Sequence, residues 1–230
     1  MDANRIQATG ITKRYGRLTA LDHVSFSIHP GEILGLIGPN GSGKTTLFEC
    51  LGGVLPLDAG TVTGGPRQFF YLPDGIAPWP SQTVRWALQF AIDFFGGADR
   101  RDEVVSQLDL TAVLDSAIGT LSKGQRKRAL LAIGLLMPQP ILLADEPFDG
   151  LDLRQTRELA ATLRAHAQSG RTLFLSIHQI ADAARVCDRF VLLSNGRVCG
   201  EGTVAELSAR AGMRASTATA DLEEVFLALT

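Results

Sequence analysis

The sequence predicts an α/β fold with a mainly parallel sheet and an antiparallel β layer in its first third. In the second half of the chain, short apolar runs typical of buried strands alternate with helical segments, which is the pattern of a parallel sheet. In the first third, Val24, Phe26 and Ile28 alternate with serines, as in a half-exposed antiparallel strand. The 230 residues, 45% hydrophobic and 20% charged, are enough for one globular domain with a buried core.

Each element is justified by its hydrophobic period or by its turn residues. Strands are expected at residues 6–15, 21–28, 32–37, 61–63, 68–72, 141–144, 172–177, 190–193 and 197–199. Helices are expected at residues 45–51, 84–95, 101–108, 123–137, 153–168 and 180–186, with two short helices closing the chain. Turns are expected at residues 30–31, 58–60 and 195–196. Residues 73–81 carry three prolines, so they form neither a helix nor a central strand.

Residues 38–46 fit the phosphate-loop pattern of Gly, four residues, then Gly-Lys-Ser/Thr. They are Gly38, Pro39, Asn40, Gly41, Ser42, Gly43, Lys44, Thr45 and Thr46. The strand expected before them and the helix expected after them supply the context that this motif requires. Tight glycine turns point several backbone N–H groups at a polyphosphate, and the helix dipole adds to that field. Lys44 is then placed to reach the outer phosphates, and the Thr45 hydroxyl to ligate Mg²⁺.

A pair of carboxylates, Asp145 and Glu146, follows the apolar strand at 141–144. A carboxylate at the carboxyl end of a parallel strand lies on the ligand-binding edge of the sheet. We therefore expect Asp145 to hold Mg²⁺ through its hydration shell, and Glu146 to polarise an attacking water. The alternative is that the pair forms a helix cap or a turn at the end of the strand.

A second phosphate-binding element is predicted at Leu121-Ser122-Lys123-Gly124-Gln125. Ser122 resembles the N-cap of the helix that follows, and the start of that helix offers free N–H groups and a positive dipole end. One nucleotide cannot easily use both elements within one molecule if they lie apart on the surface. We therefore expect a dimer, in which the second element of one copy meets the first element of the other.

Together these residues resemble the nucleotide-binding subunit of an ABC transporter, and the similarity covers most of the chain. Residues 121–125 are similar to the signature sequence of that family, and residues 141–146 to its Walker B strand with the catalytic glutamate. Residues 148–152 resemble the loop that follows this strand in the family.

Three further residues match the family pattern. His178 matches the switch histidine, Tyr15 the aromatic residue that stacks on adenine, and Asp152 the aspartate that closes the loop after Walker B. Alternatively, Tyr15 is a core aromatic residue, His178 is a helix N-cap or a satisfied polar residue, and Asp152 is the N-cap of the helix at 153–168.

The resemblance implies a P-loop NTPase core within a single ABC ATPase domain over residues 1–230. The antiparallel β layer and the P-loop core occupy residues 1–73 and 140–210. A helical subdomain, which carries the signature sequence, occupies about residues 74–139, and short C-terminal helices occupy residues 203–230.

The resemblance also implies hydrolysis of ATP with Mg²⁺ in two composite sites of a dimer. The implied catalytic residues are Lys44, Glu146 and His178. The implied metal ligands are Thr45, Asp145 and Asp74. The nucleotide also contacts Tyr15 and residues 38–46, with Ser122, Gly124 and Gln125 supplied by a second copy or by a paralogous ATPase.

The implied partner is a membrane permease, contacted through residues 73–81 with Ile76, Pro78 and Trp79 as apolar anchors. The longest apolar run, at 129–137, is too short to span a bilayer, so any membrane role is expected to come through a partner. The resemblance implies a cytoplasmic protein that is peripheral on the inner face of the membrane. Residues 221–227 resemble a C-terminal motif of bacterial exporter-type ATPases, which points to export.

The sequence departs from the family pattern at three places. Asp74 stands where the glutamine of the family's glutamine loop is expected. A carboxylate there would add negative charge near Mg²⁺ and the γ-phosphate, which affects the geometry and the affinity of the site. The interval from Lys44 to Asp74 is shorter than in the family, so the antiparallel subdomain is expected to lack a strand or loop. Lys123 replaces a signature glycine, and its side chain either approaches the partner's phosphates or points to solvent.

Composition bears on the remaining alternatives. The net charge of −2 gives no reason to expect nucleic-acid binding, and Cys50, Cys187 and Cys199 are too far apart in sequence for a metal site. One rival hypothesis is a soluble ABC ATPase acting on DNA or ribosomes, which typically carries a coiled coil or a second cassette. Another is a regulatory cassette that hydrolyses ATP poorly, which the carboxylate of Asp74 keeps open.

Overall fold

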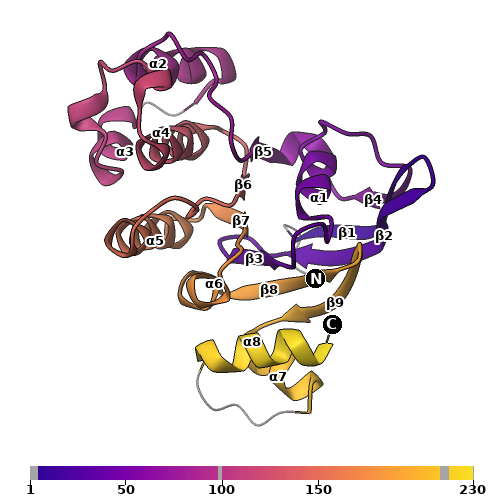
Figure 1. The fold of residues 1–230 in the computed structure, drawn as a ribbon. Coiled ribbons are helices and arrows are strands. Elements are labelled where there is room, and N and C mark those ends of the chain that lie inside the picture. Colours follow the sequence, from indigo (N-terminus) through magenta and orange to yellow (C-terminus); the bar gives the residue numbers. More distant parts are fainter. Residues whose placement is uncertain (1–4, 98–99, 213–217, 230) are drawn as a thin grey trace.

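The computed structural model describes residues 5–97, 100–212 and 218–229, with side chains in the last segment from 222 onward, and these residues contain two β-sheets (Figure 1). A six-stranded sheet has the order β5-β6-β7-β3-β8-β9, and a three-stranded antiparallel sheet has the order β2-β1-β4. The six-stranded sheet is parallel except for the β8–β9 hairpin. The strands are β1 (Ile6–Tyr15), β2 (Leu18–Ile28), β3 (Ile33–Ile37), β4 (Ala59–Val62), β5 (Phe69–Leu72), β6 (Ile141–Asp145), β7 (Thr172–Ser176), β8 (Arg189–Ser194) and β9 (Arg197–Gly202).

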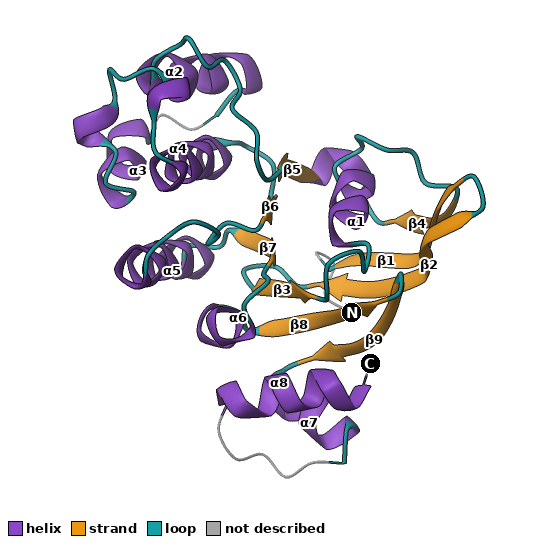
Figure 2. Ribbon diagram, viewed as in Figure 1, coloured by secondary structure: helices purple, strands orange, loops and turns teal. Residues whose placement is uncertain are grey.

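One set of helices lies against the parallel sheet, and a second set gathers at one side of it (Figure 2). The α-helices are α1 (Lys44–Leu51), α2 (Val84–Phe95), α3 (Arg101–Gln107), α4 (Lys123–Leu136), α5 (Leu153–Gln168), α6 (Ile180–Val186), α7 (Val204–Arg210) and α8 (Ala218–Leu229). Three short 3₁₀ helices are η1 (Pro66–Gln68), η2 (Thr111–Val113) and η3 (Ile118–Thr120). None of the helices in the described part of the chain is both long enough and apolar enough to cross a membrane.

The alternation of side chains along the central strand β3 creates two cores. Leu34 and Leu36 face the antiparallel sheet and α1, whereas Ile33 and Ile37 face the helices on the other side. On the first side, the ring of Phe174 lies 5.4 Å from that of Phe26 and 4.9 Å from that of Phe48. This aromatic cluster joins the two sheets and α1 into one packed unit.

The helices α2, α3 and α4 form the helical subdomain, which lies apart from α1 and β4 in Figure 1. Residues 73–83 lead into it from β5, and residues 137–140 lead out of it to β6. As the three prolines predict, residues 73–81 contain neither a helix nor a strand. This layout agrees with the α/β fold and the two sheets expected from the sequence.

Most predicted elements are found, and three are α-helices with the expected bounds: 84–95, 153–168 and 180–186. The turn expected at 58–60 is wrong, because Ala59 and Gly60 already belong to β4 and Ala59 pairs with Thr12. The expectation that Ser27 is exposed is also wrong. Its hydroxyl donates to Glu201 at 2.6 Å, so this polar residue is satisfied inside the protein.

Candidate active site

The phosphate loop lies between the end of β3 and the start of α1. Its glycines let neighbouring backbone segments lie closer to the loop than a side chain would permit. Gly43 has φ 106° and Gly41 has φ 80°, a region that other residues rarely adopt. A Cβ at Gly38 would lie 2.2 Å from the carbonyl oxygen of Leu193, and one at Gly43 would lie 2.7 Å from that of Ala20. Ser42 is buried, and its hydroxyl has no hydrogen-bond partner, so this cradle contains a free donor for an anionic oxygen.

Lys44 is the first residue of α1, and its side chain folds back over the loop. Its Nζ donates to the carbonyl oxygens of Gly38 at 2.8 Å and Pro39 at 3.2 Å. Burial lowers the pKa of Lys44, while the negative charges of Glu146 and Asp145 oppose that shift. The ammonium therefore lies at the loop and within the field of both predicted carboxylates.

Asp145 and Thr45 come together as the sequence predicts. The Thr45 hydroxyl donates to Oδ2 of Asp145 at 2.9 Å, and Asp145 is only 6% exposed. Oδ1 of the same carboxylate accepts a hydrogen bond from the hydroxyl of Ser176. A hydroxyl and a carboxylate in contact are the oxygen ligands that Mg²⁺ prefers, so these residues fit the predicted metal.

Ser176 is a site residue that sequence reasoning missed. It lies at the end of β7, opposite Asp145 in the parallel register. Its hydroxyl also accepts a hydrogen bond from the backbone N–H of Glu146 at 3.0 Å, so one side chain fixes both carboxylate residues. The available signal was a hydroxyl at the end of an otherwise apolar, buried strand.

Glu146 has an unusual backbone conformation, with φ 48°. This left-handed region is unfavourable for a residue with a long side chain, and it persists only where the surroundings hold it. The carbonyl oxygen of Glu146 accepts the N–H of Asp149 at 3.2 Å and also Nζ of Lys127. Contacts on both the N–H and the carbonyl side therefore hold this residue in place.

Two cavities meet at Glu146. One of about 460 Å³ is lined by the phosphate loop, Lys44, Tyr15 and the turn at residues 195–196, the last of which sequence reasoning did not assign to the site. The other, of about 450 Å³, is lined by residues 148–151 and by His178, which is exposed. A larger cavity of about 760 Å³ lies at the opposite edge of the sheet and contains none of the predicted site residues.

The predicted signature residues lie at the start of α4, away from the phosphate-loop cavity. Ser122 and Gln125 form a capping box, in which the Ser122 hydroxyl accepts the Gln125 N–H at 3.2 Å and Oε1 of Gln125 accepts the Ser122 N–H at 3.0 Å. A Cβ at Gly124 would lie 3.0 Å from Cδ2 of Leu151, so this helix end packs on the loop after β6. None of the three lines either cavity at Glu146.

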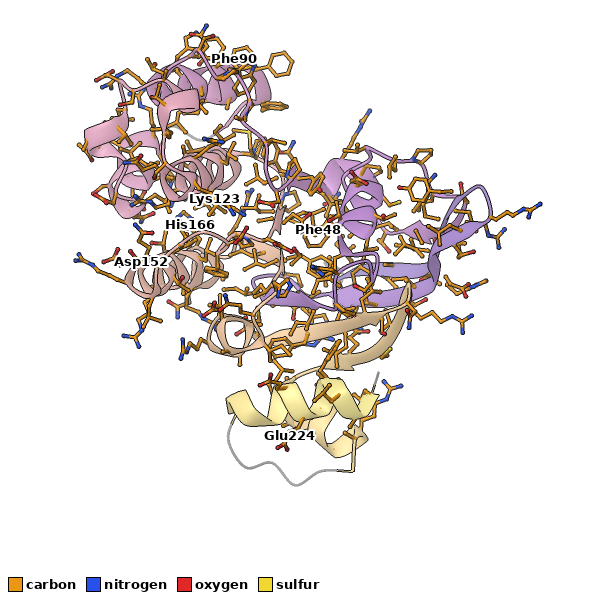
Figure 3. All side chains as sticks on the ribbon, viewed as in Figure 1. Phe48, Phe90, Lys123, Asp152, His166 and Glu224 are labelled. Carbon is orange, nitrogen blue, oxygen red and sulfur yellow. The ribbon has the colours of Figure 1, made fainter. Side chains whose placement is uncertain are left out.

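Asp74 lies close to Glu146 and contacts a lysine of α4. Its Oδ1 is 2.7 Å from Nζ of Lys127, and its carboxylate comes within 4.8 Å of those of Glu146 and Asp149. The structure therefore gives Asp74 a lysine partner, which sequence reasoning did not anticipate. Lys123 pairs with Asp149 at 2.7 Å within the same chain, and Figure 3 labels it beside the gap between α4 and α5.

Comparisons with known proteins show which family this chain resembles. A family model described as "ABC transporter" matches residues 21–149. The linearmycin resistance ATP-binding protein LnrL of Bacillus subtilis (strain 168) is 28% identical over 223 residues, which cover 90% of this chain and 72% of that protein. The Nod factor export ATP-binding protein I of Ralstonia nicotianae (strain ATCC BAA-1114 / GMI1000) is 33% identical over 218 residues, covering 88% and 68%. Among solved structures, an ATP binding subunit of an ABC transporter matches with a TM-score of 0.87 and 28% identity, covering 97% of this chain and 98% of that one.

Proposed function

Since this chain belongs to the ABC transporter family, we propose that two copies close around two Mg-ATP and that hydrolysis drives export through a separate membrane permease. The chain is an ABC transporter ATPase, the ATP-binding subunit that energises the transporter. The observation that carries the proposal is the contact of Asp145 with Thr45 beside the phosphate loop, with Ser176 linking that contact to Glu146.

The chemistry follows from the positions of these residues. The backbone N–H groups of the loop and Lys44 bind the phosphates of ATP. Thr45 and Asp145 would hold Mg²⁺, which neutralises phosphate charge as the terminal bond breaks. The Oδ1 atom of Asp74, the third ligand that the resemblance implies, lies 2.7 Å from Nζ of Lys127. Glu146 accepts a hydrogen bond from the attacking water and orients it toward the γ-phosphate. His178, which lines the second cavity, is proposed to contact the γ-phosphate, and Tyr15, which lines the first, to stack on the adenine.

The proposal of composite sites rests on the separation of the two phosphate-binding elements. Ser122, Gly124 and Gln125 do not line the phosphate-loop cavity of their own chain. Two copies in a head-to-tail dimer would let the start of α4 in one copy complete the loop of the other. The N–H groups and dipole there then stabilise the charge that develops on the γ-phosphate.

The proposed permease contact is the segment 73–81. Ile76 is 37% exposed, and the ring of Trp79 packs 5.2 Å from Phe90, a residue that Figure 3 labels at the edge of the helical subdomain. Along α2, the rings of Trp86, Phe90 and Phe94 stack at 5.0 and 5.5 Å, and Phe94 is 69% exposed. Aromatic side chains that remain exposed in this way are typical of contact surfaces.

Export and placement on the inner membrane face are also part of the proposal. One relative is named for resistance to linearmycin and another for export of Nod factor, which supports an outward direction for this chain. A chain with no spanning helix among its described residues would reach the membrane through its permease.

The substitution Glu146→Gln tests the proposal. We expect ATP binding to remain while turnover falls at least about 100-fold, on the order of 3 kcal/mol in the barrier, because the amide orients water poorly. Turnover is measured as phosphate release and binding as the Kd for ATP. Glu158→Gln, an exposed change on α5 outside both cavities, is the matched control and should keep its turnover. Near-normal hydrolysis by purified Glu146→Gln protein would contradict the assignment.

A second candidate function is a regulatory cassette that binds ATP and hydrolyses it poorly. Asp74 favours it, because its carboxylate adds negative charge 4.8 Å or less from that of Glu146. A steady-state ATPase measurement with and without the membrane partner separates the two, since only the energising subunit should turn over faster with its permease.

A further inference from the structure

We propose that Lys127 is a positioning residue that holds Glu146 in its reactive conformation, and that Asp74 is the counter-ion that keeps Lys127 charged and in place. The proposal rests on the ATPase function proposed above. It concerns two residues that the family resemblance either did not assign, as with Lys127, or assigned differently, as with Asp74.

Lys127 lies on the buried side of α4, one turn after Gly124. Its side chain is only 10% exposed, and its Nζ makes two contacts, one with Oδ1 of Asp74 at 2.7 Å and one with the carbonyl oxygen of Glu146. A buried ammonium is stable only where carboxylates and carbonyl oxygens replace its water. The carboxylate is that of Asp74 and the carbonyl oxygen is that of Glu146, and neither residue belongs to a helix of the helical subdomain.

The contact with Glu146 acts on the residue whose backbone is strained. Its φ of 48° is held on the N–H side by Ser176 and on the carbonyl side by Lys127 and Asp149. Ser176, at the end of β7, contacts only the N–H of Glu146 and so fixes the peptide unit before this residue. Lys127, from α4, fixes the peptide unit after it through the carbonyl oxygen, and the direction of the Glu146 side chain depends on both contacts.

Through its two contacts, Lys127 joins three segments that are far apart in the sequence. Asp74 lies near the start of the segment after β5, Lys127 belongs to the helical subdomain, and Glu146 follows β6. A displacement of the segment 73–81 or of α4 therefore changes the force on the Glu146 carbonyl directly. This gives the proposed permease contact a physical route to the residue that orients water.

The test compares Lys127→Met with Lys127→Arg in steady-state ATPase and ATP-binding measurements on the full chain. We expect Lys127→Met to lower kcat at least about tenfold while the Kd for ATP changes less than about threefold, since the loop that binds phosphate is untouched. Lys127→Arg keeps a charged donor and should retain kcat within about threefold of the wild type. A folded Lys127→Met protein with wild-type kcat would overturn the proposal.

A charge reversal separates positioning from simple ion pairing. In Asp74→Lys/Lys127→Asp, the ion pair can re-form, but a carboxylate at position 127 cannot donate to the Glu146 carbonyl. We expect the double variant to regain thermal stability relative to either single variant without regaining kcat. Recovery of kcat together with stability would show that the pair is only structural, and would overturn the proposal.

Lys13→Met is the matched control for loss of a buried lysine. The Lys13 side chain is 9% exposed, and its Nζ contacts the carbonyl oxygen of Pro56 at 2.8 Å and Asp58 at 3.4 Å. Its Nζ also lies 5.9 Å from the centroid of the Tyr15 ring, so an effect on nucleotide contact should change the Kd and leave kcat unchanged. Equal loss of kcat in Lys13→Met and Lys127→Met would mean that instability, and not positioning, explains the result.

Two outcomes distinguish this proposal from the proposed function. If Lys127→Met fails to fold, Asp74→Asn removes the counter-ion from a partly exposed position, and its kcat should fall while its Kd for ATP is kept. Unchanged kcat in Asp74→Asn would then overturn the proposal. A wild-type chain that never hydrolyses ATP, even with its permease, refutes the proposed function itself.

Discussion

The Ser176 hydroxyl shows how few atoms are needed to arrange the two carboxylate residues. A hydroxyl has one hydrogen to donate, and it goes to the carboxylate of Asp145. The lone pairs that remain accept the N–H of Glu146 at 3.0 Å. Asp145 is thereby held as an acceptor toward Ser176 while its other oxygen contacts Thr45 at 2.9 Å. The three residues therefore have one consistent set of hydrogen-bond directions.

Single-residue burial also makes a prediction for the cysteines. Burial raises the pKa of Cys50 to about 11, so at pH 8 only about one thiol in a thousand is ionised. Because the thiolate is the reactive form, we expect iodoacetamide to modify Cys50 slowly in the native protein and rapidly in denaturant. Cys199 is partly exposed and should be modified first, which peptide mass spectrometry can follow. Modification of native Cys50 as fast as Cys199 would contradict this burial.

At the scale of elements, the N-termini of α4 and α5 both lie at the loop that follows β6. Capping boxes begin α4 at Ser122 and α5 at Asp152, and the two helix ends meet where Gly124 packs on Leu151. The sequence alternative that Asp152 is an N-cap is confirmed, since its carboxylate accepts the N–H of Gln155 at 2.8 Å. Its match to the family's closing aspartate stays a prediction.

The cap at Asp152 predicts a specific loss of stability. Asp152→Ala leaves the first N–H groups of α5 without their acceptor and should lower the free energy of unfolding by about 1 kcal/mol. Asp152→Asn keeps a side-chain oxygen and should lose much less. Urea unfolding followed by circular dichroism measures both. Equal losses in the two variants would show that charge, and not the cap, is what Asp152 contributes.

The sequence predicted most of the parallel sheet because buried strands and their terminal carboxylates have a strong local pattern. It predicted Thr45 and Asp145 as Mg²⁺ ligands but not their direct contact, which the structure shows at 2.9 Å, at the side of the sheet where the parallel strands β3 and β6 both end. It missed Lys127 because a lysine on a helix is usually solvated, and only tertiary packing provides Asp74 and the Glu146 carbonyl as partners. The early start of β4 was missed because alanine and glycine, here Ala59 and Gly60, are uncommon in strands, and pairing with β1 overrides that preference.

At the scale of the whole molecule, the described chain places its two phosphate-binding elements in different parts of the fold. The loop at 38–46 lies at the end of the parallel sheet, whereas the start of α4 belongs to the helical subdomain (Figure 1). A dimer in which each copy completes the other's site is therefore the proposed active form.

Dimerisation predicts that the rate per molecule depends on concentration. We expect ATP hydrolysis per chain to rise with protein concentration until dimers saturate, because a single copy lacks the second element. Phosphate release is measured over a dilution series, with an inert carrier protein as the control for adsorption. A constant rate per chain, down to concentrations where sedimentation shows only monomer, would argue against composite sites.

The way the helical subdomain is attached also limits how it can move. Its incoming connection, 73–83, leaves the carboxyl end of β5, and its outgoing connection, 137–140, enters the amino end of the neighbouring parallel strand β6. The two attachments therefore lie at opposite ends of these two strands, about one strand length or 15 Å apart. Two such points define an axis along the strands. The subdomain also shares a buried core with these strands, since Gly134 of α4 lies against Leu72 of β5 and Leu142 of β6. A rotation about this axis must therefore slide α4 over the two strands, and that packing limits how far the subdomain can turn.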